Sequence, residues 1–261
     1  MRKHKLSCFL IVCNEGDRLD RCLEGLAGWV DQLVILDSGS SDNTVEIAKR
    51  YSTEVHCTDW PGFGAQRNRA LTYCQHEWVL NIDADEEITE SLKAEIDDFL
   101  SRDAIEETLV KIPWQTILFG KPVNFGRYAS PQGKLFLKEG ARFKDAAVHE
   151  TLILPSEKVR CLKAKLRHYS WRDYRHLQEK HVQYAALSAA DKFKSGKRSS
   201  LAYATLRFFT DFTQQYLLRL GCLDGWRGFL LAIVLAQYAF NKYAGLVVLQ
   251  RTIPITEQSS L

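Results

Sequence analysis

Two aspartates one residue apart, Asp83 and Asp85, directly follow the apolar run 78–82. A short apolar run bounded by turn formers is typical of a buried parallel strand, and ligands of open α/β sheets bind just beyond the carboxyl ends of such strands. Two carboxylates can hold one hard cation, which in turn bridges to substrate phosphates. The pair therefore predicts a site for a metal-bound diphosphate, although an isolated Asp-x-Asp is also found in solvated loops between a strand and a helix.

Three earlier segments supply further polar groups at expected strand ends. The apolar run 6–12 ends at Asn14 and Glu15 and precedes an amphipathic helix expected from about Arg18 to Trp29. The run 33–36 ends at Asp37, and Ser41 or Asp42 is suited to cap the helix that follows.

A glycine-rich loop then enters a helix at residues 62–71. Its first turn carries basic and amide groups, namely Gln66, Arg67 and Asn68.

Taken in order, these segments resemble the inverting glycosyltransferases of family 2, which have the GT-A fold and include cellulose and chitin synthases. The resemblance covers roughly the first hundred residues. It implies that Asp37 contacts the uracil or ribose of a UDP-sugar donor, and that Asn14 and Glu15 line the same pocket. It also implies that Gln66, Arg67 and Asn68 help hold the nucleotide. Asp85 would ligate Mg²⁺ or Mn²⁺, with Asp83 close to the ribose or the metal.

Three later segments carry a narrower resemblance to bacterial lipopolysaccharide inner-core β-1,4-glucosyltransferases: residues 140–150, 167–171 and 224–229. It implies a metal-dependent hexosyltransferase that uses a UDP-glucose-type donor. The acceptor would be a phosphorylated, lipid-linked saccharide of the lipopolysaccharide inner core.

Direct inversion needs one base to take the proton of the acceptor hydroxyl. The family resemblance makes Glu150 the candidate base, with His149 orienting it or the acceptor; a strand-end glutamate in a salt bridge is the alternative. His168 follows an alternating segment, 159–167, that indicates a half-exposed strand. In related GT-A enzymes a histidine here supplies a metal ligand, and the alternative is a histidine hydrogen-bonded near Tyr169 and Trp171.

The alternation of helical and strand patterns predicts an α/β fold, a Rossmann-like mixed sheet flanked by helices, with a helical C-terminal extension. We expect a catalytic domain at 1–170, with a nucleotide-sugar half (1–110) and an acceptor half (111–170). Residues 171–261 form the extension. The seven cysteines are scattered, with no Cys-x-x-Cys, and indicate reduced thiols of a cytoplasmic protein.

The formal charge of +3 conceals a strong asymmetry. Residues 1–110 carry 11 Lys and Arg against 22 Asp and Glu, whereas the remainder carries 24 against 10. An acidic front half suits a metal site, and a basic rear half suits an anionic acceptor or an anionic membrane surface. No sequence motif of a nucleic-acid-binding protein accompanies the basic half.

The spacing of apolar residues in the extension predicts helices at 173–194 and 201–220, and the apolar block 228–240 follows them. That block is shorter than the roughly 20 residues of a membrane span. Basic residues flank it in sequence, so we expect peripheral attachment to the cytoplasmic face of the bacterial inner membrane. The alternative is a helix packed in a core or against a second subunit.

Other functions leave different signatures. A polyprenyl-phosphate sugar transferase, or another transferase of cell-envelope glycans, commonly has unmistakable membrane spans. A nucleotidyltransferase opens with a glycine-rich phosphate loop, which residues 13–17 do not form. A catalytically silent sugar-binding scaffold has no need to retain Asp37, Asp83, Asp85 and Glu150 together.

Overall fold

The structure is a computed structural model and describes residues 2–144 and 151–252. The chain divides into two compact units, which are described separately. Unit 1 comprises the residues up to 115 together with 130–169, and unit 2 comprises 116–129 together with the residues from 170 onward. Residues 116–129, which the sequence interpretation assigned to the acceptor half, thus group with the helical extension.

Unit 1 is built on a mixed sheet whose strands follow the order β3-β2-β1-β4-β8-β6-β12-β5. The parallel part contains β1 (Leu6–Val12), β2 (Gln32–Asp37), β3 (Glu54–Cys57) and β4 (Trp78–Asn81). The antiparallel part contains β5 (Glu86–Glu87), β6 (Leu109–Leu118), β8 (Pro131–Leu137) and β12 (Leu166–His168), with β11 (Val159–Cys161) parallel to β6. A separate hairpin pairs β9 (Arg142–Phe143) with β10 (Leu152–Ile153).

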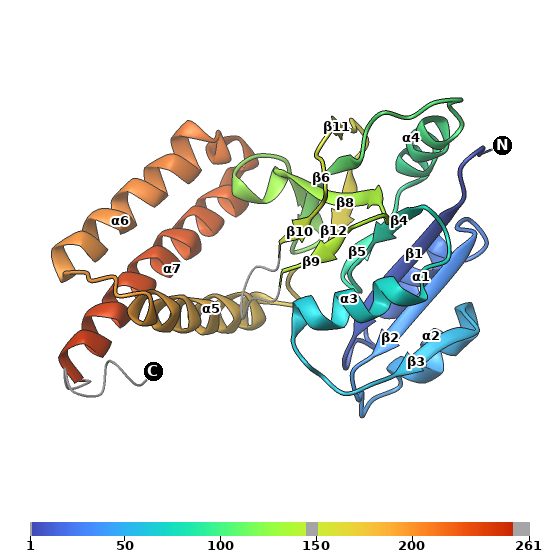
Figure 1. The fold of residues 1–261 in the computed structure, drawn as a ribbon. Coiled ribbons are helices and arrows are strands. Elements are labelled where there is room, and N and C mark those ends of the chain that lie inside the picture. The colour runs from blue at the N-terminus through green and yellow to red at the C-terminus, as the bar shows by residue number, and fades with distance from the viewer. Residues whose placement is uncertain (1, 145–150, 253–261) are drawn as a thin grey trace. The chain divides into compact units, whose positions relative to one another are not determined.

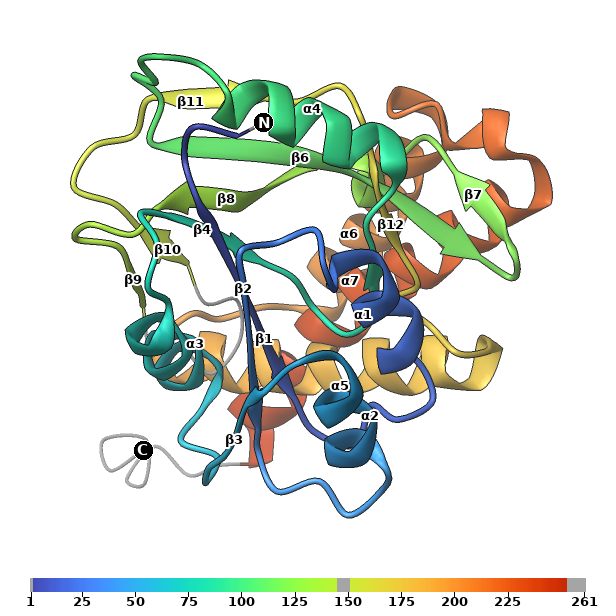
Figure 2. The same ribbon diagram turned by 90° about the vertical axis from the view of Figure 1, so that its right-hand side faces the viewer.

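Helices cover both faces of the parallel strands (Figure 2). The helices α1 (Leu19–Leu26), α2 (Thr44–Tyr51) and α4 (Glu90–Leu100) share one apolar core with Leu6, Cys8, Leu10 and Val12 of β1. Phe9 points to the other face, where α3 (Phe63–Tyr73) contributes Ala70 and Leu71. Strands buried on both faces explain why β1 and β2 are nearly continuous apolar runs rather than alternating ones.

Unit 2 consists mainly of α5 (Tyr174–Lys194), α6 (Leu201–Thr213) and α7 (Gly225–Thr252), which lie side by side in Figure 1. A π-helical turn (Gln214–Leu218) and a 3-10 turn (Gly221–Asp224) join α6 to α7. Strand β7 (Lys121–Val123) pairs with the end of β6, and a 3-10 turn follows at Arg127–Ala129. Leu118, Val123 and Trp171 pack against Leu177, Leu231 and Leu235.

The α/β class with a helical C-terminal region is confirmed, whereas several element bounds differ from those predicted. The first helix ends at Leu26 because Ala27 adopts an extended conformation and Gly28 a positive φ of 73°. The expected strand over 159–167 is two short strands, β11 and β12. The expected helix 201–220 remains α-helical only to Thr213 before the π turn.

The apolar block 228–240 belongs to a much longer helix than the sequence interpretation allowed. Together with the preceding turn, α7 gives a helical segment, Gly221–Thr252, long and apolar enough to cross a membrane by length and composition alone. The helix continues through Lys242 into a second apolar stretch, so the shortness of the block 228–240 does not apply to the helix as a whole. Of its most apolar window, 44% is buried inside the structure, and a core helix passes the same test of length and composition.

Candidate active site

The loop after β2 is organised around the buried Asp37 carboxylate. Its Oδ2 accepts hydrogen bonds from the backbone N–H groups of Gly39 and Ser40, both at 2.9 Å. Gly39 has a φ of 85°, a conformation that glycine adopts without strain, and this lets the chain turn back around the carboxylate. The structure thus places Asp37 at the carboxyl edge of the parallel strands, as predicted.

Asn14 joins the loop after β1 to the loop after β2. Its Oδ1 accepts the N–H of Ser41 at 2.8 Å, and its own N–H donates to Ser40 Oγ at 2.8 Å. The N–H of Glu15 donates to Thr44 Oγ1 at 2.8 Å. Asn14, Glu15 and Asp37 are therefore brought together at one edge of the sheet, with a φ of 54° at Asn14.

The three polar residues of α3 have different surroundings. The Gln66 side chain is fully buried and donates to Ser38 Oγ at 2.9 Å and Thr58 Oγ1 at 2.7 Å, so it supports the Asp37 loop from beneath. Asn68 exchanges two hydrogen bonds with the backbone of Phe143, at 2.7 and 2.8 Å. The structure therefore gives Asn68 a role in holding β9, and brings Arg67 alone of the three to Asp83.

Asp83 lies in a network of opposite charges. Its Oδ1 is 2.9 Å from Arg67 Nη2, and its Oδ2 is 2.7 Å from Lys134 Nζ. Lys134 Nζ also contacts Glu86 Oε2 at 2.8 Å, and both the Lys134 and the Glu86 side chains are almost fully buried. Glu86 further accepts the N–H of Asp83 at 2.9 Å and the Trp114 indole N–H at 2.7 Å.

The network shifts the pKa values of its members in opposite directions. Burial by itself would raise the pKa of Asp83, but the attraction of Arg67 and Lys134 outweighs it and holds that pKa well below the usual range. Burial raises the pKa of Glu86 against the opposing effect of Lys134. For Lys134, burial works against the charged form, yet the two carboxylates raise its pKa. Asp83 is thus a carboxylate already neutralised by protein cations.

Asp85 has a different setting. Its Oδ2 is 3.5 Å from His168 Nε2 and 3.6 Å from Nη1 of the buried Arg18. The ring of His168 stacks on Trp114 at a centroid distance of 4.2 Å, and Trp114 is in turn held by Glu86. The network around Glu86 therefore also fixes the orientation of His168.

The donor set fits a divalent cation whose coordination is completed by substrate. A carboxylate oxygen and an imidazole nitrogen converge from β12 and the loop after β4, and Mg²⁺ commonly binds through one or two carboxylates plus phosphate oxygens. Within the described residues no group of three or more His, Cys, Asp or Glu side chains is arranged to hold a metal by itself. Asp85 and His168 would hold the cation, and Asp83 is committed to Arg67 and Lys134.

The candidate base Glu150 and its neighbour His149 lie outside the described residues. The sequence interpretation missed Arg18, Lys134, Glu86 and Trp114. One signal was available for Lys134, since it is the single cation inside the strand run 131–137.

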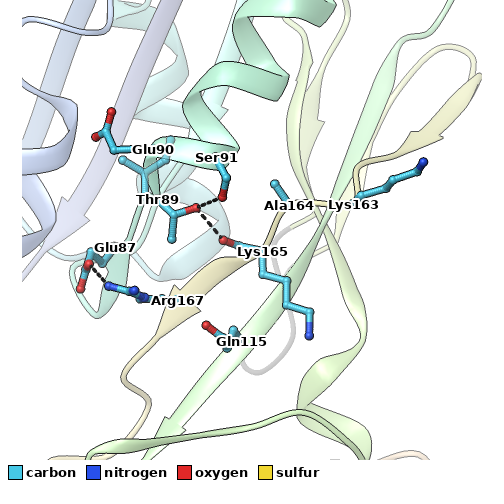
Figure 3. A pocket seen from close by; sticks show the side chains of 10 residues that line it. Glu87, Thr89, Glu90, Ser91, Gln115, Lys163, Ala164, Lys165 and Arg167 are labelled. Carbon is cyan, nitrogen blue, oxygen red and sulfur yellow. Dashed lines mark hydrogen bonds and ion pairs between the residues drawn. The ribbon is translucent and has the colours of Figure 1, made fainter.

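The pairing of β12 with β5 separates this site from a second surface. His168 lies opposite Glu86 and faces the site, whereas Arg167 lies opposite Glu87 and is bonded to it at 2.7 Å. Figure 3 shows Arg167, Lys163 and Lys165 around a pocket together with Glu87 and Glu90. The carboxylates of Glu87 and Glu90 offset part of the positive charge in this pocket. We therefore expect the pocket to attract anions less than its basic side chains alone would.

A mixed sheet with carboxylates gathered at the ends of its parallel strands agrees with the GT-A fold that the sequence resemblance implies. Residues 7–112 match the family model described as glycosyl transferase family 2. This segment therefore carries a glycosyl transferase family 2 domain, and most of the chain is similar to glycosyltransferases.

Similar proteins match over most of the chain. An uncharacterized glycosyltransferase of Rickettsia bellii is 26% identical over 253 residues, which cover 93% of this chain and 86% of the relative. The lipopolysaccharide core biosynthesis glycosyltransferase LpsC of Rhizobium meliloti is 29% identical over 91% of this chain and 90% of the relative. Among solved structures, S. aureus TarS 1–349 in complex with UDP-GlcNAc is 16% identical, covers 95% of this chain and 91% of its own, and has a TM-score of 0.48.

Proposed function

We propose that the protein is a metal-dependent inverting hexosyltransferase that transfers a sugar, glucose in the first instance, from a UDP-sugar to the lipopolysaccharide inner core. The observation that carries the proposal is the convergence of Asp85 and His168 at 3.5 Å, in the same unit as the Asp37 loop. The similarity to LpsC supports the acceptor class. Assays of a panel of UDP-sugars with deacylated core saccharide, followed by linkage analysis of the product, test the proposal.

In this proposal each group has a defined task. The Asp37 loop receives the uridine, and Asp85 and His168 hold a divalent cation. The cation, when bound, neutralises the negative charge that builds up on the leaving diphosphate. Arg67 keeps Asp83 ionised and in place, and the stack of Trp114 on His168 keeps the imidazole nitrogen directed at Asp85.

We propose Glu150 as the base that takes the proton of the acceptor hydroxyl. Glu150→Gln preserves the shape of the side chain and removes its ability to accept a proton, so turnover should fall by about 10²-fold or more while UDP-sugar binding persists. Turnover and donor affinity measured on the same preparation separate the two effects. His149→Gln serves as the neighbouring control and should lower turnover less. Turnover near that of the parent in Glu150→Gln would assign the base to another residue.

We further propose that the protein works at the cytoplasmic face of the bacterial inner membrane as a peripheral protein. Exposed basic residues near the end of α5 and after it support electrostatic attraction to anionic lipid: Lys194, Lys197 and Arg198. Exposed apolar side chains of unit 2, among them Leu218, Leu223 and Trp226, support additional insertion at the interface.

Salt screens the electrostatic part of such attachment within about 10 Å at moderate ionic strength and leaves the apolar part intact. We therefore expect partial release from isolated membranes by high salt and fuller release by mild detergent, measured by sedimentation. Reversal of Lys192, Lys194, Lys197 and Arg198 to Glu should lower vesicle binding and leave UDP-sugar hydrolysis unchanged. Extraction only by bilayer-dissolving detergent would instead indicate that α7 spans the membrane.

Two other functions remain as alternatives. A polyprenyl-phosphate sugar transferase, or a transferase of another envelope glycan, would use the same donor site, and it gains some support from the length of α7. A silent sugar-binding scaffold would bind UDP-sugar without hydrolysis or transfer. The acceptor panel distinguishes the first alternative, and the absence of turnover with every donor would favour the second.

A further inference from the structure

Unit 2 contains an open surface pocket of about 650 Å³, here called the cavity, where the end of α5, the start of α6 and the C-terminal half of α7 meet. Its lining includes Lys192, Lys197 and Arg198 together with the hydroxyl-bearing residues Ser200, Tyr203 and Tyr243. In the described part of the chain no carboxylate lines this cavity. The chemistry of its wall is therefore cationic and rich in hydrogen-bond donors.

Three cations surround one aromatic ring at the wall of the cavity. Lys192 Nζ, Lys242 Nζ and Arg207 Cζ lie 5.5, 5.1 and 5.9 Å from the ring centroid of Tyr243. Arg207 has a carboxylate partner, Asp211, at 2.6 Å. Among the described residues neither Lys192 nor Lys242 forms an ion pair with a carboxylate, so this cluster carries an excess of positive charge.

Burial and the neighbouring cations both act on Lys242. Its burial, followed by the neighbouring Lys192, lowers the pKa of Lys242 to about 8; Arg127 and Arg207 act in the same direction, and Asp211 opposes them. Repulsion among half-buried cations is relieved when an anion binds between them. The start of α6 adds to this preference, because Ser200 caps the helix and the positive end of the helix dipole lies at the cavity wall.

We propose that this cavity binds a phosphate group carried by a saccharide or by a lipid headgroup. Lysine and arginine side chains, hydroxyl groups and a helix N-terminus are the usual partners of phosphate oxygens. The inference extends the proposed function and rests on it only for the choice of a sugar phosphate as one source of the ligand. All the residues involved belong to unit 2, whereas the donor-site residues belong to unit 1.

The test compares two double variants of the full chain. Lys192→Gln/Lys197→Gln removes two charges from the cavity, and Arg175→Gln/Lys180→Gln removes two charges from the other end of the same helix. Glucose 6-phosphate and inorganic phosphate are titrated by calorimetry, with glucose as the neutral control. In a second arm, vesicles of phosphatidylglycerol are compared with vesicles of phosphatidylcholine by cosedimentation.

We expect saturable binding in at least one arm, weakened about tenfold or more in the cavity variant and less than about twofold in the control variant, because only the cavity variant removes charge-assisted hydrogen bonds to the phosphate. Binding of the soluble phosphates identifies a saccharide phosphate as the source, and binding of anionic vesicles alone identifies a lipid headgroup. Equal weakening in both variants, or no saturable binding in either arm, would overturn the inference.

Two further measurements keep the result unambiguous. Arg198→Gln, a single substitution of an exposed side chain, should also weaken binding and serves if the double variant folds poorly, as judged by its thermal unfolding. UDP-sugar hydrolysis is recorded for every variant and should match the parent. If hydrolysis is absent even in the parent, the proposed function fails while the phosphate titration still decides this inference.

Discussion

Asp85→Asn is expected to lower sugar transfer by about 10²- to 10³-fold, the usual cost of removing one electrostatic contact to the charge that develops in a transition state. The amide keeps the shape of the side chain but cannot hold a divalent cation as a carboxylate does. The same loss should follow when the parent enzyme is treated with excess chelator, and Mg²⁺ or Mn²⁺ should restore activity only in the parent. Initial rates of UDP release measure both effects.

Asp103→Asn is the matched control for this substitution. Asp103 lies on the same unit with a side chain 92% exposed and pairs with Lys3, far in sequence from the strand-end loops. Its rate should equal that of the parent. Full activity of the parent in excess chelator would show that Asp85 does not act through a metal and would leave its contacts with Arg18 and His168 as structural ones.

Lys134→Met is expected to destabilise the protein by about 3–5 kcal/mol, the range found when one member of a buried ion pair is removed. The substitution leaves Glu86 buried without its cation and leaves Asp83 with Arg67 alone. Denaturant unfolding of the variant and the parent measures the difference in their free energies of unfolding. The comparison requires that this free energy has the same slope against denaturant concentration in both proteins.

Two variants determine whether that loss comes from the uncompensated carboxylate. Lys138 lies in the same region, and its side chain donates a hydrogen bond to the backbone carbonyl of Cys74. Lys138→Met removes only this bond, so the free energy of unfolding should fall by about 1 kcal/mol. Glu86→Gln added to Lys134→Met removes the buried charge and should recover part of the lost stability. A double variant less stable than the sum of the two single variants would contradict this explanation.

The sequence was most informative where a strand is buried on both faces. β1, β2 and β4 are short apolar runs, and the polar residues that end them, such as Asp37 and Asp85, necessarily gather at one edge of a parallel sheet. Local pattern therefore predicted the α/β class and the gathering of these carboxylates, whereas their donor-site roles came from the family resemblance.

The sequence pattern was uninformative about residues whose burial and partners depend on tertiary contacts. Lys134 and Arg18 appear in the sequence as ordinary cations, and only the folded chain shows that both are buried beside the strand-end carboxylates. Asn68 is adjacent in sequence to Arg67, yet the rotation of about 100° between consecutive helical residues directs it to the backbone of Phe143 instead. The length of α7 was missed because Lys242 interrupts the apolar run, and its partial burial among helices became visible only in the structure.

Above all, we propose that the chain transfers a sugar from a UDP-sugar with inversion at the anomeric carbon. The most direct measurement is the NMR determination of the anomeric configuration in the product formed from UDP-glucose, a divalent cation and deacylated inner-core saccharide. We expect a β-linked glucose from the α-configured donor, with no product after chelation of the cation. An α-linked product, or no transfer to that acceptor from any UDP-sugar, would contradict it.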